Sequence, residues 1–536
     1  MTSTGIQQTF QLAMRHHQEG RLPEAEVIYR QILQTRPDHA GALHHLGQIA
    51  GQAGAYGKAV ELIGRAIEAD DRVAEFHCNL AEAYRATGRL DQAGDSYHRA
   101  LDLDANQAHA HFGLAGVLSE RNRLDEAEDS LHRGLALRPR TAMAYCMLGD
   151  IYRRRGRAEK AVEHLQRAVT LEPGLTLAHN NLGSLLQRIG RLDQAVDAYH
   201  SAICIDPHQV DLHTNLGHAL KELDRLDEAV ATYRAALALD EGFAEAHFGL
   251  ANALRDQGKK SEAAVAYERA IALNPGFTEA YSAYGVLLNE LGRSEEAIAR
   301  FHRALSLEPR HVRSCANLGL ALRVEGRGDE ADAFFDYDRL VQHRRFDRVA
   351  GWDGLDAFNA ALAEYIYGRA DLMRDRPSVA TKGGSQTGNI LLDDHPVTRT
   401  LLSMMQGLYQ DYLETAIAGD TDPYFDEPPA SWLIKANAVV LNSNGYQEPH
   451  IHPVGYCSGV YYVRIPEPVR TALDSENGYI RFGKAGPGEP PPGGRRVTIK
   501  PEAGLMLIFP SYFWHGTIPF ESGEDRISVA FDVEPC

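Results

Sequence analysis

The chain has no excess of positive charge and no long apolar run, and each absence excludes a class of protein. Its 55 lysines and arginines stand against 73 aspartates and glutamates, so the 536 residues carry a net charge of −18. A nucleic-acid-binding protein usually has a clustered basic face, so we expect no nucleic-acid partner. No apolar run approaches the roughly 20 residues that a membrane-spanning helix needs, so we expect no membrane partner.

Cysteine is scarce, and the first residues show no secretory pattern. Residues 1–8 contain no basic stretch followed by an apolar one, unlike a signal peptide. The six cysteines are scattered and none forms a C-x-x-C pair. We therefore expect a cytoplasmic protein with reduced thiols, most of them packed in cores. The cysteines are Cys78, Cys146, Cys204, Cys315, Cys457 and Cys536.

Most of the chain is an internal repeat. Prolines recur at separations that are all multiples of 34 residues, and a small residue recurs in the same phase, followed by an alanine twelve positions later. The prolines are Pro37, Pro139, Pro173, Pro207, Pro275 and Pro309. The small residues are Ala13, Gly47, Ala81, Ala115, Gly149, Gly183, Gly217, Ala251, Gly285 and Gly319. Ten units in one phase predict a stack of helical hairpins.

The composition of each unit explains why the units must stack. Each has two amphipathic stretches of helical period, and one hairpin alone cannot bury its apolar face. The small residues let the paired helices approach closely. In the turn between them, an aspartate such as Asp193 or Asp227 is expected to cap the second helix.

This pattern resembles the tetratricopeptide repeat, and residues 178–277 look especially like the repeats of O-linked N-acetylglucosamine transferase. We therefore expect an all-α solenoid of about ten repeats over residues 6–345. The resemblance does not extend to the transferase activity, because the remaining 191 residues (536 − 345) are too few for its two-domain nucleotide-sugar fold.

Two polar residue types recur in the first helix of the repeats. Histidine occupies one position, and hairpin spacing of roughly 10 Å is too wide for neighbours to share a metal ion, so we interpret it as an aromatic packing position. The histidines are His77, His111, His179, His213 and His247, with Tyr145 and Tyr281 in the same place. Asparagine follows two residues later, at Asn79, Asn181, Asn215 and Asn317.

The asparagines form a candidate substrate-binding row. An amide both donates and accepts hydrogen bonds, so a row along the groove suits the backbone of a protein or peptide partner. In the transferase that the repeats resemble, such a row holds peptide substrates. The row is incomplete here, and asparagine also satisfies local backbone groups, so packing within the array is the alternative.

After Arg345 the period is lost and the sequence becomes β-rich. Residues 355–367 and 397–417 are predicted to be helical, within a helical lead-in over 346–430. The predicted strands are 432–442, 457–463, 479–482, 496–500, 505–509, 515–520 and 526–533, with an exposed loop at 483–494. Short strands in this number predict a double-sheet jelly roll, also called a double-stranded β-helix, over 431–536.

Chemistry-bearing residues lie in this last domain. His450 and His452 are two apart, so on an extended strand both imidazoles face one way and can bind one metal ion. His515 precedes a strand, and a hairpin would bring Arg526 beside it, with Ser528 on the same face as Arg526. A dicarboxylic co-substrate needs such a layout, because one end chelates the metal while the guanidinium pairs with the other.

These segments resemble a known family. The stretches Q-E-P-H-I-H-P at 447–453, S-G-V-Y-Y-V at 458–463, G-L-M-L-I-F-P-S at 504–511 and R-I-S-V-A-F at 526–531 are similar to a family of bacterial 2-oxoglutarate/Fe(II) oxygenases, relatives of the prolyl hydroxylases. The resemblance implies a hydroxylase with Fe(II) at the histidines and 2-oxoglutarate as co-substrate, its far carboxylate on Arg526 and Ser528.

One departure from the family pattern leaves alternatives open. The usual triad is two histidines and a carboxylate in an H-x-D/E order, and here His452 stands at the carboxylate position. A third imidazole makes Zn or Ni better competitors for Fe(II), and Glu448 is an alternative source of a carboxylate. The substitution also keeps a second function open, namely a repeat scaffold carrying a catalytically inert, cupin-like metal-binding module.

Overall fold

A computed structural model of the chain describes residues 3–375, 380–417, 424–426, 428–472, 474–483 and 495–536. By its internal contacts the chain divides into two compact units, Met1–Glu241 and Gly242–Cys536. The predicted loop 483–494 lies outside the described residues except for Gly483. Among the described residues, no helix is both long and apolar enough to cross a membrane.

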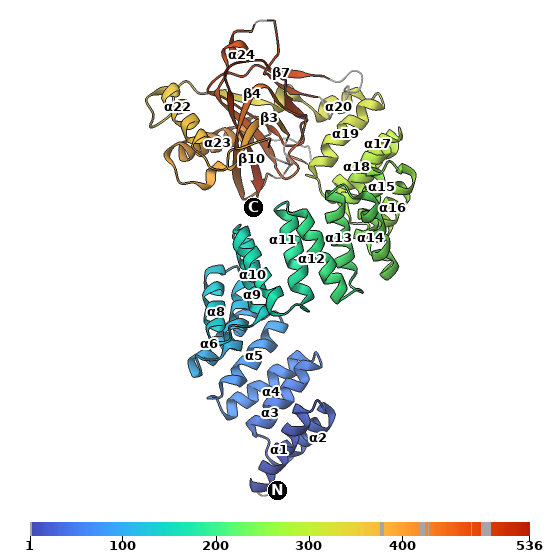
Figure 1. Cartoon of the computed structure of the whole chain (residues 1–536), viewed down its shortest axis with the longest axis vertical. Coiled ribbons are helices and arrows are strands. Elements are labelled where there is room, and N and C mark those ends of the chain that lie inside the picture. Colours follow the sequence, from blue (N-terminus) through green and yellow to red (C-terminus); the bar gives the residue numbers. More distant parts are fainter. Residues whose placement is uncertain (1–2, 376–379, 418–423, 427, 473, 484–494) are drawn as a thin grey trace. The chain divides into compact units, whose positions relative to one another are not determined.

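Twenty helices pair into hairpins that follow the predicted period (Figure 1). In the first unit they are α1 (Ser3–Gln18), α2 (Leu22–Thr35), α3 (Ala40–Gln52), α4 (Tyr56–Ala69), α5 (Ala74–Ala86), α6 (Leu90–Leu103), α7 (Ala108–Glu120), α8 (Leu124–Leu137), α9 (Ala142–Arg154), α10 (Ala158–Leu171), α11 (Thr176–Arg188), α12 (Leu192–Ile205), α13 (Val210–Glu222) and α14 (Leu226–Leu239). The second unit begins with α15 (Ala244–Asp256), α16 (Lys260–Leu273), α17 (Thr278–Glu290), α18 (Ser294–Leu307), α19 (Val312–Val324) and α20 (Gly328–Phe334). The predicted solenoid is therefore confirmed, and its last helix is a short one.

The small residues let the paired helices approach, as the sequence predicts. A Cβ on Gly183 would lie 2.8 Å from the ring of Tyr199, and one on Gly217 would lie 2.7 Å from that of Tyr233. Both tyrosines are fully buried. In these two hairpins the first helix thus receives an aromatic side chain of its partner where a larger residue would collide with it.

The recurring histidines form hydrogen bonds to the turns between repeats. The Nε2 atoms of four of them lie 3.0 or 3.1 Å from the carbonyl oxygen six residues earlier. These four are His77, His111, His179 and His213. Since a carbonyl only accepts, each ring donates its N–H to the preceding turn. Three of these rings, His77, His111 and His179, are also buried, as the packing interpretation predicts.

The predicted aspartate caps are wrong. The N-cap residues of α12 and α14 are Arg191 and Arg225, and neither side chain caps its helix. Asp193 and Asp227 lie two residues after the N-cap, as the second residue of each helix. At that position a carboxylate is still stabilised by the positive end of the helix dipole.

The second unit continues into an antiparallel, jelly-roll-like domain with two sheets (Figure 1). The larger sheet has the strand order β1-β8-β5-β10-β4-β3-β2 and the smaller one β7-β6-β9. The strands are β1 (Gln342–Arg345), β2 (Met373–Arg374), β3 (Thr381–Asn389), β4 (Trp432–Gln447), β5 (Cys457–Arg464), β6 (Ile480–Phe482), β7 (Val497–Ile499), β8 (Leu505–Pro510), β9 (His515–Thr517) and β10 (Arg526–Pro535). The helical segments are α21 (Tyr337–Leu340), α22 (Gly354–Tyr367), η1 (Ile390–Leu392), α23 (Pro396–Thr415) and α24 (Glu467–Thr471).

Every strand predicted between 432 and 533 is present, and three further strands were not predicted. Two of these, β2 and β3, fall in the segment expected to be a helical lead-in. The third, β1, pairs along its whole length with β8. The larger sheet therefore includes three strands that precede the predicted core domain in the sequence.

One hydrophobic core joins the last repeat to this domain. Val312 and Cys315 of α19 and Phe335 after α20 belong to the same buried cluster as Phe509 and Phe513. The hydroxyl of Tyr512 also donates to the carbonyl oxygen of Phe334, at 3.1 Å. The predicted domain boundaries at 345/346 and 430/431 remain predictions, and the apolar packing is continuous across the first of them.

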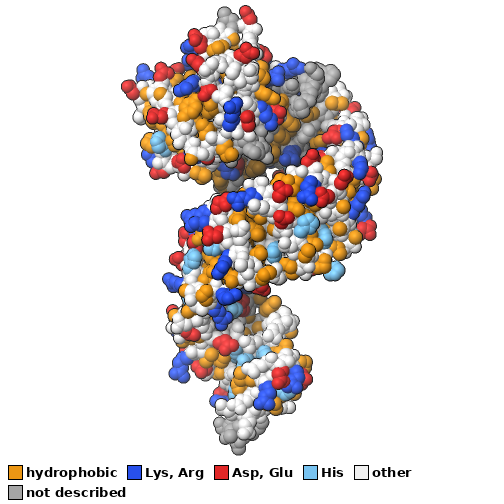
Figure 2. Space-filling view, viewed as in Figure 1, with side chains coloured by type: hydrophobic (Ala, Val, Ile, Leu, Met, Phe, Trp, Pro, Cys, Tyr) orange, Lys and Arg blue, Asp and Glu red, His pale blue; other side chains and the backbone are white. Residues whose placement is uncertain are grey.

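The surface carries charges of both signs. On the face that Figure 2 presents, red carboxylate and blue basic side chains alternate with apolar ones over the repeats. Four of the cysteines are buried and Cys204 and Cys536 are exposed, all as free thiols.

Candidate metal and co-substrate site

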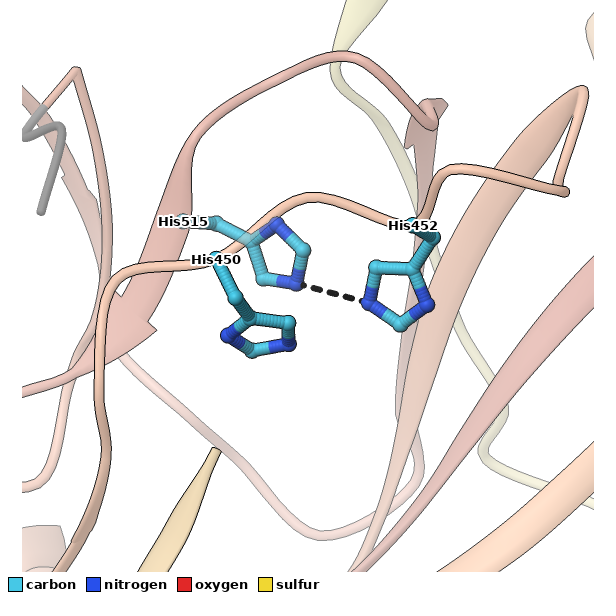
Figure 3. A group of neighbouring side chains, drawn as sticks. All are labelled: His450, His452 and His515. Carbon is cyan, nitrogen blue, oxygen red and sulfur yellow. Dashed lines mark hydrogen bonds between the residues drawn. The ribbon is translucent and has the colours of Figure 1, made fainter. Parts of the chain in front are cut away.

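Three histidines from two distant segments meet beside the smaller sheet (Figure 3). His450 and His452 lie in the loop after β4, and His515 begins β9. The main chains of His450 and His515 form an antiparallel bridge with N–O distances of 2.9 and 3.1 Å. Gly516 permits this approach, because a Cβ there would lie 2.8 Å from the carbonyl oxygen of Gln447.

Hydrogen bonds at Nδ1 orient all three rings. The Nδ1 atom of His450 lies 2.7 Å from the carbonyl oxygen of Glu448, and that of His515 lies 2.9 Å from that of Phe513. The Nδ1 atom of His452 lies 2.7 and 2.9 Å from the two carboxylate oxygens of Asp532. Because carbonyls and carboxylates only accept, each Nδ1 carries a proton, so Nε2 is the nitrogen that each ring can offer to a metal ion.

The three rings converge. One ligand atom from each ring lies within 4.8 Å of the others, and the Nε2 atoms of His452 and His515 form a hydrogen bond of 3.3 Å (Figure 3). Neutral imidazoles fixed through their other nitrogen are the usual form of protein metal ligands. The donor set fits a divalent first-row metal such as Fe, Ni or Zn.

Burial and charge act differently on the three rings. Burial, together with His452, lowers the pKa of His450 to about 4. Burial also lowers the pKa of His515 well below its usual value. For His452 burial acts in the same direction, but the adjacent charge and hydrogen bond of Asp532 outweigh it and raise the pKa. His450 and His515 are therefore uncharged at neutral pH, ready to bind a metal.

Asp532 is a site residue that the sequence analysis missed. Burial alone would raise the pKa of its carboxyl group, but His452 and the hydroxyl of Ser458 hold it below its usual value. Asp532 lies on β10 at an even spacing from Arg526 and Ser528, so strand alternation places all three on one face. That alternation is the signal that would have found it.

Glu448, the alternative carboxylate, is not part of the cluster. Its side chain is exposed and its nearest charged partner is Lys382, at 3.9 Å. It contributes only its carbonyl oxygen, to the ring of His450.

Arg526 is a buried cation with unused hydrogen-bonding capacity. Its side chain is 2% exposed, and its Nε and Nη1 atoms have no hydrogen-bond partner. Its guanidinium carbon lies 5.1 Å from the ring centroid of Tyr462. Ser528, two residues along β10, is also buried and lies opposite Tyr462. Two partnerless nitrogens on a buried guanidinium are costly, and a carboxylate would satisfy them with a paired, bidentate geometry.

The candidate asparagine row is half-buried, and most of its amides already have partners. Asn79 donates to Nε2 of His44 at 2.7 Å, Asn215 donates to the side chain of Asn180 at 3.1 Å, and Asn317 donates to the carbonyl of Arg313 at 2.7 Å. Among the described residues, Asn181 makes no side-chain hydrogen bond. Asn79 also lines a pocket of about 390 Å³ between the second and third hairpins.

Comparisons with known families match both parts of the chain. Residues 435–532 match a family described as "Putative 2OG-Fe(II) oxygenase". Residues 214–276, 283–339 and 266–299 match families described as tetratricopeptide repeat. Residues 2–213 match the family of the C-terminal domain of cilia and flagella-associated protein 70. A comparison with curated proteins found no match.

Similar solved structures include several repeat proteins. MamA is 26% identical over 30% of this chain and 94% of its own, with a TM-score of 0.28. YrrB, described as a TPR protein with an unusual peptide-binding site, is 26% identical over 35% of this chain and 96% of its own, with a TM-score of 0.30. PilF of Pseudomonas aeruginosa is 21% identical over 41% and 98%, with a TM-score of 0.36. By its family matches, the chain carries tetratricopeptide repeats followed by a C-terminal domain that matches the "Putative 2OG-Fe(II) oxygenase" family over residues 435–532.

Proposed function

We propose that the C-terminal domain is an Fe(II)- and 2-oxoglutarate-dependent hydroxylase. In this proposal His450, His452 and His515 bind the metal through Nε2, and Arg526 with Ser528 binds the far carboxylate of 2-oxoglutarate. The observation that carries the proposal is Arg526, whose buried guanidinium has two nitrogens without partners. A metal-binding module without a co-substrate has no need for such a group.

The chain's own residues would position and shield the reaction. When bound, Fe(II) with 2-oxoglutarate supplies oxygen chemistry in which one atom of O₂ becomes the substrate hydroxyl and the other enters succinate, with release of carbon dioxide. The three imidazoles occupy only part of a metal's coordination sphere, so positions stay open for small molecules. Arg526 fixes the direction of the co-substrate, and the buried wall around Tyr462 excludes water.

We further propose that the repeats hold the protein or peptide that is modified. Membership of the tetratricopeptide-repeat families supports a role in binding proteins. Asn181 is the strongest member of the asparagine row, because its amide makes no side-chain hydrogen bond within the part of the chain that the structure describes. Asn317 is the weakest, because its amide hydrogen already serves its own helix.

The decisive test is turnover of 2-oxoglutarate by the full chain. With Fe(II) and O₂, the wild-type protein should release succinate, and the His515→Ala variant should not. Stoichiometric metal binding without any succinate would instead support the scaffold function, in which the domain is a catalytically inert metal-binding module.

A further inference from the structure

The candidate metal site contains no carboxylate, yet one carboxylate lies directly behind it. His450, His452 and His515 offer three neutral nitrogen ligands. A metal ion held by two histidines and a carboxylate would receive one negative charge from the protein. Asp532 carries such a charge and lies against the back of His452, with its oxygens 2.7 and 2.9 Å from Nδ1.

The contacts of Asp532 hold its carboxylate in this orientation. Ser458, which lies opposite Asp532 in the pairing of β5 with β10, donates its hydroxyl to Oδ1 at 2.6 Å. The hydroxyl of Ser458 lies 2.8 Å from that of Ser511, and both serines are fully buried. Gly455 leaves room for the group, because a Cβ there would lie 2.4 Å from Oγ of Ser511. This is a built arrangement of side chains from three segments.

The arrangement is specific to one of the three histidines. Nδ1 of His450 and Nδ1 of His515 donate to carbonyl oxygens, which are uncharged. Only His452, the residue at the carboxylate position of the H-x-D/E pattern, donates to a charged group. A carboxylate on Nδ1 makes Nε2 a stronger donor to a metal and fixes the direction of its lone pair.

We propose that Asp532 is a positioning residue that supplies, through the ring of His452, the negative charge that a directly bound carboxylate would bring to the metal. The proposal rests on the proposed metal site, and it assigns a role to a residue that the sequence alone did not single out. Ser458 and Ser511 act through Asp532 by keeping its carboxylate on Nδ1.

The test compares full-length variants by their affinity for Fe(II), measured anaerobically in competition with a chromophoric chelator. Asp532→Asn keeps the shape and an oxygen that can accept from Nδ1 but removes the charge, and we expect it to weaken Fe(II) binding about 10–100-fold. Ser458→Ala should give a smaller loss. The matched control is Glu534→Gln, which removes one charge two residues along β10, where the carboxylate pairs with Lys435.

A second measurement separates charge from geometry. The Fe(III)/Fe(II) reduction potential should rise in Asp532→Asn, because loss of the negative charge destabilises Fe(III) more than Fe(II). Asp532→Glu, which keeps the charge, should leave the potential close to that of the wild type. Equal Fe(II) affinity and equal potential in the wild type and Asp532→Asn would overturn the proposal while leaving the metal site intact. If the wild type binds no Fe(II), the proposed function itself fails.

Discussion

His450 and His515 are 65 positions apart in the sequence, yet their main chains pair as a two-residue antiparallel bridge, with N–O distances of 2.9 and 3.1 Å. The bridge fixes the loop after β4 against the start of β9. Because it uses backbone atoms only, we expect it to persist when either imidazole is removed. Substitutions of the ligand histidines therefore test metal binding while the backbone contact between the two segments remains.

Removing a ligand imidazole should remove the metal. We expect His515→Ala to abolish stoichiometric Fe(II) binding and His450→Ala to weaken it severely, because two imidazoles leave the ion with too few protein ligands. Metal content after anaerobic reconstitution measures this directly. Glu448→Gln is the control, since that side chain is exposed and outside the cluster. Full retention of iron in both alanine variants would refute the ligand assignment.

Arg526 should determine the affinity for 2-oxoglutarate and not for the metal. Removing one partner of a buried charge pair costs about 3–5 kcal/mol. Arg526→Ala should therefore raise the apparent dissociation constant for 2-oxoglutarate roughly 100-fold or more, with unchanged iron content. Arg464→Ala, an exposed arginine on the neighbouring strand, should change neither.

The same variant has a second expected effect, on stability. A buried guanidinium with two partnerless nitrogens destabilises the protein when no co-substrate is bound. Without 2-oxoglutarate, Arg526→Ala should therefore melt at the same temperature as the wild type or higher. A lower melting temperature, combined with an unchanged apparent dissociation constant for 2-oxoglutarate, would show that Arg526 has a structural role instead.

Substrate capture by the repeats should depend on the asparagines unequally. Asn181→Ala combined with Asn215→Ala should slow hydroxylation of a protein substrate and leave uncoupled 2-oxoglutarate turnover unchanged. Asn317→Ala should have little effect, because its amide already donates to Arg313 within α19. Product formation measured by mass spectrometry distinguishes these cases. Equal hydroxylation rates for the wild type, the double variant and Asn317→Ala would mean that the repeats bind another partner.

The position of the shared core predicts which fragment folds. A fragment of residues 346–536 would lose the buried side chains of Phe335 and Tyr337 and the edge strand β1. Each large buried aromatic residue contributes about 3–5 kcal/mol, and a domain is stable by only about 5–15 kcal/mol. We expect 346–536 to be unfolded or aggregated and 242–536, a compact unit, to be folded by circular dichroism. Cooperative melting of 346–536 would contradict this.

Acid should destabilise the first repeats through His44. Its ring is 1% exposed and accepts a hydrogen bond from Asn79. Burial, with the neighbouring His45 and His17, lowers its pKa to about 3. The unfolded chain therefore takes up the proton first, so stability present above about pH 6.5 is lost as the pH falls towards 3.

At pH 5 this effect amounts to about 2 kcal/mol. Hydrogen exchange of α3 and α5 at pH 7 and pH 5 measures it, with His44→Phe as the comparison, because other titrating groups affect both proteins alike. We expect the wild type to lose more protection than His44→Phe. Equal losses would show that His44 is not the sensitive group.

The repeats and most strands could be predicted because their signals are local. A fixed period places every hairpin, and β-branched and aromatic runs mark β4, β5, β8 and β10. The strand β3 was missed because its sequence, T-K-G-G-S-Q-T-G-N, has little β propensity of its own and depends on pairing with β4. The strand β1, Q-H-R-R, is polar and pairs only with the distant β8.

The candidate site was predictable in part for the same reason. The spacing of His450 and His452 is local and was sufficient to predict that pair. The predicted hairpin between His515 and Arg526 is wrong, because β9 pairs with β6 in the smaller sheet whereas β10 lies between β4 and β5 in the larger one. Asp532 was missed because its role depends on a contact with His452, which lies 80 positions earlier. No sequence motif indicates that contact. The aspartate caps failed because each helix begins one residue before the aspartate, at Leu192 and Leu226.

The central claim is that one metal ion and one molecule of 2-oxoglutarate bind together in this domain. Anaerobic titration of the full chain with Fe(II), followed by 2-oxoglutarate, tests it most directly, because bidentate chelation by the keto acid produces a visible charge-transfer band. We predict that the band appears at one equivalent of each in the wild type, is absent in His515→Ala, and needs much more 2-oxoglutarate in Arg526→Ala. A wild-type protein that binds Fe(II) but shows no band at saturating 2-oxoglutarate would contradict the account.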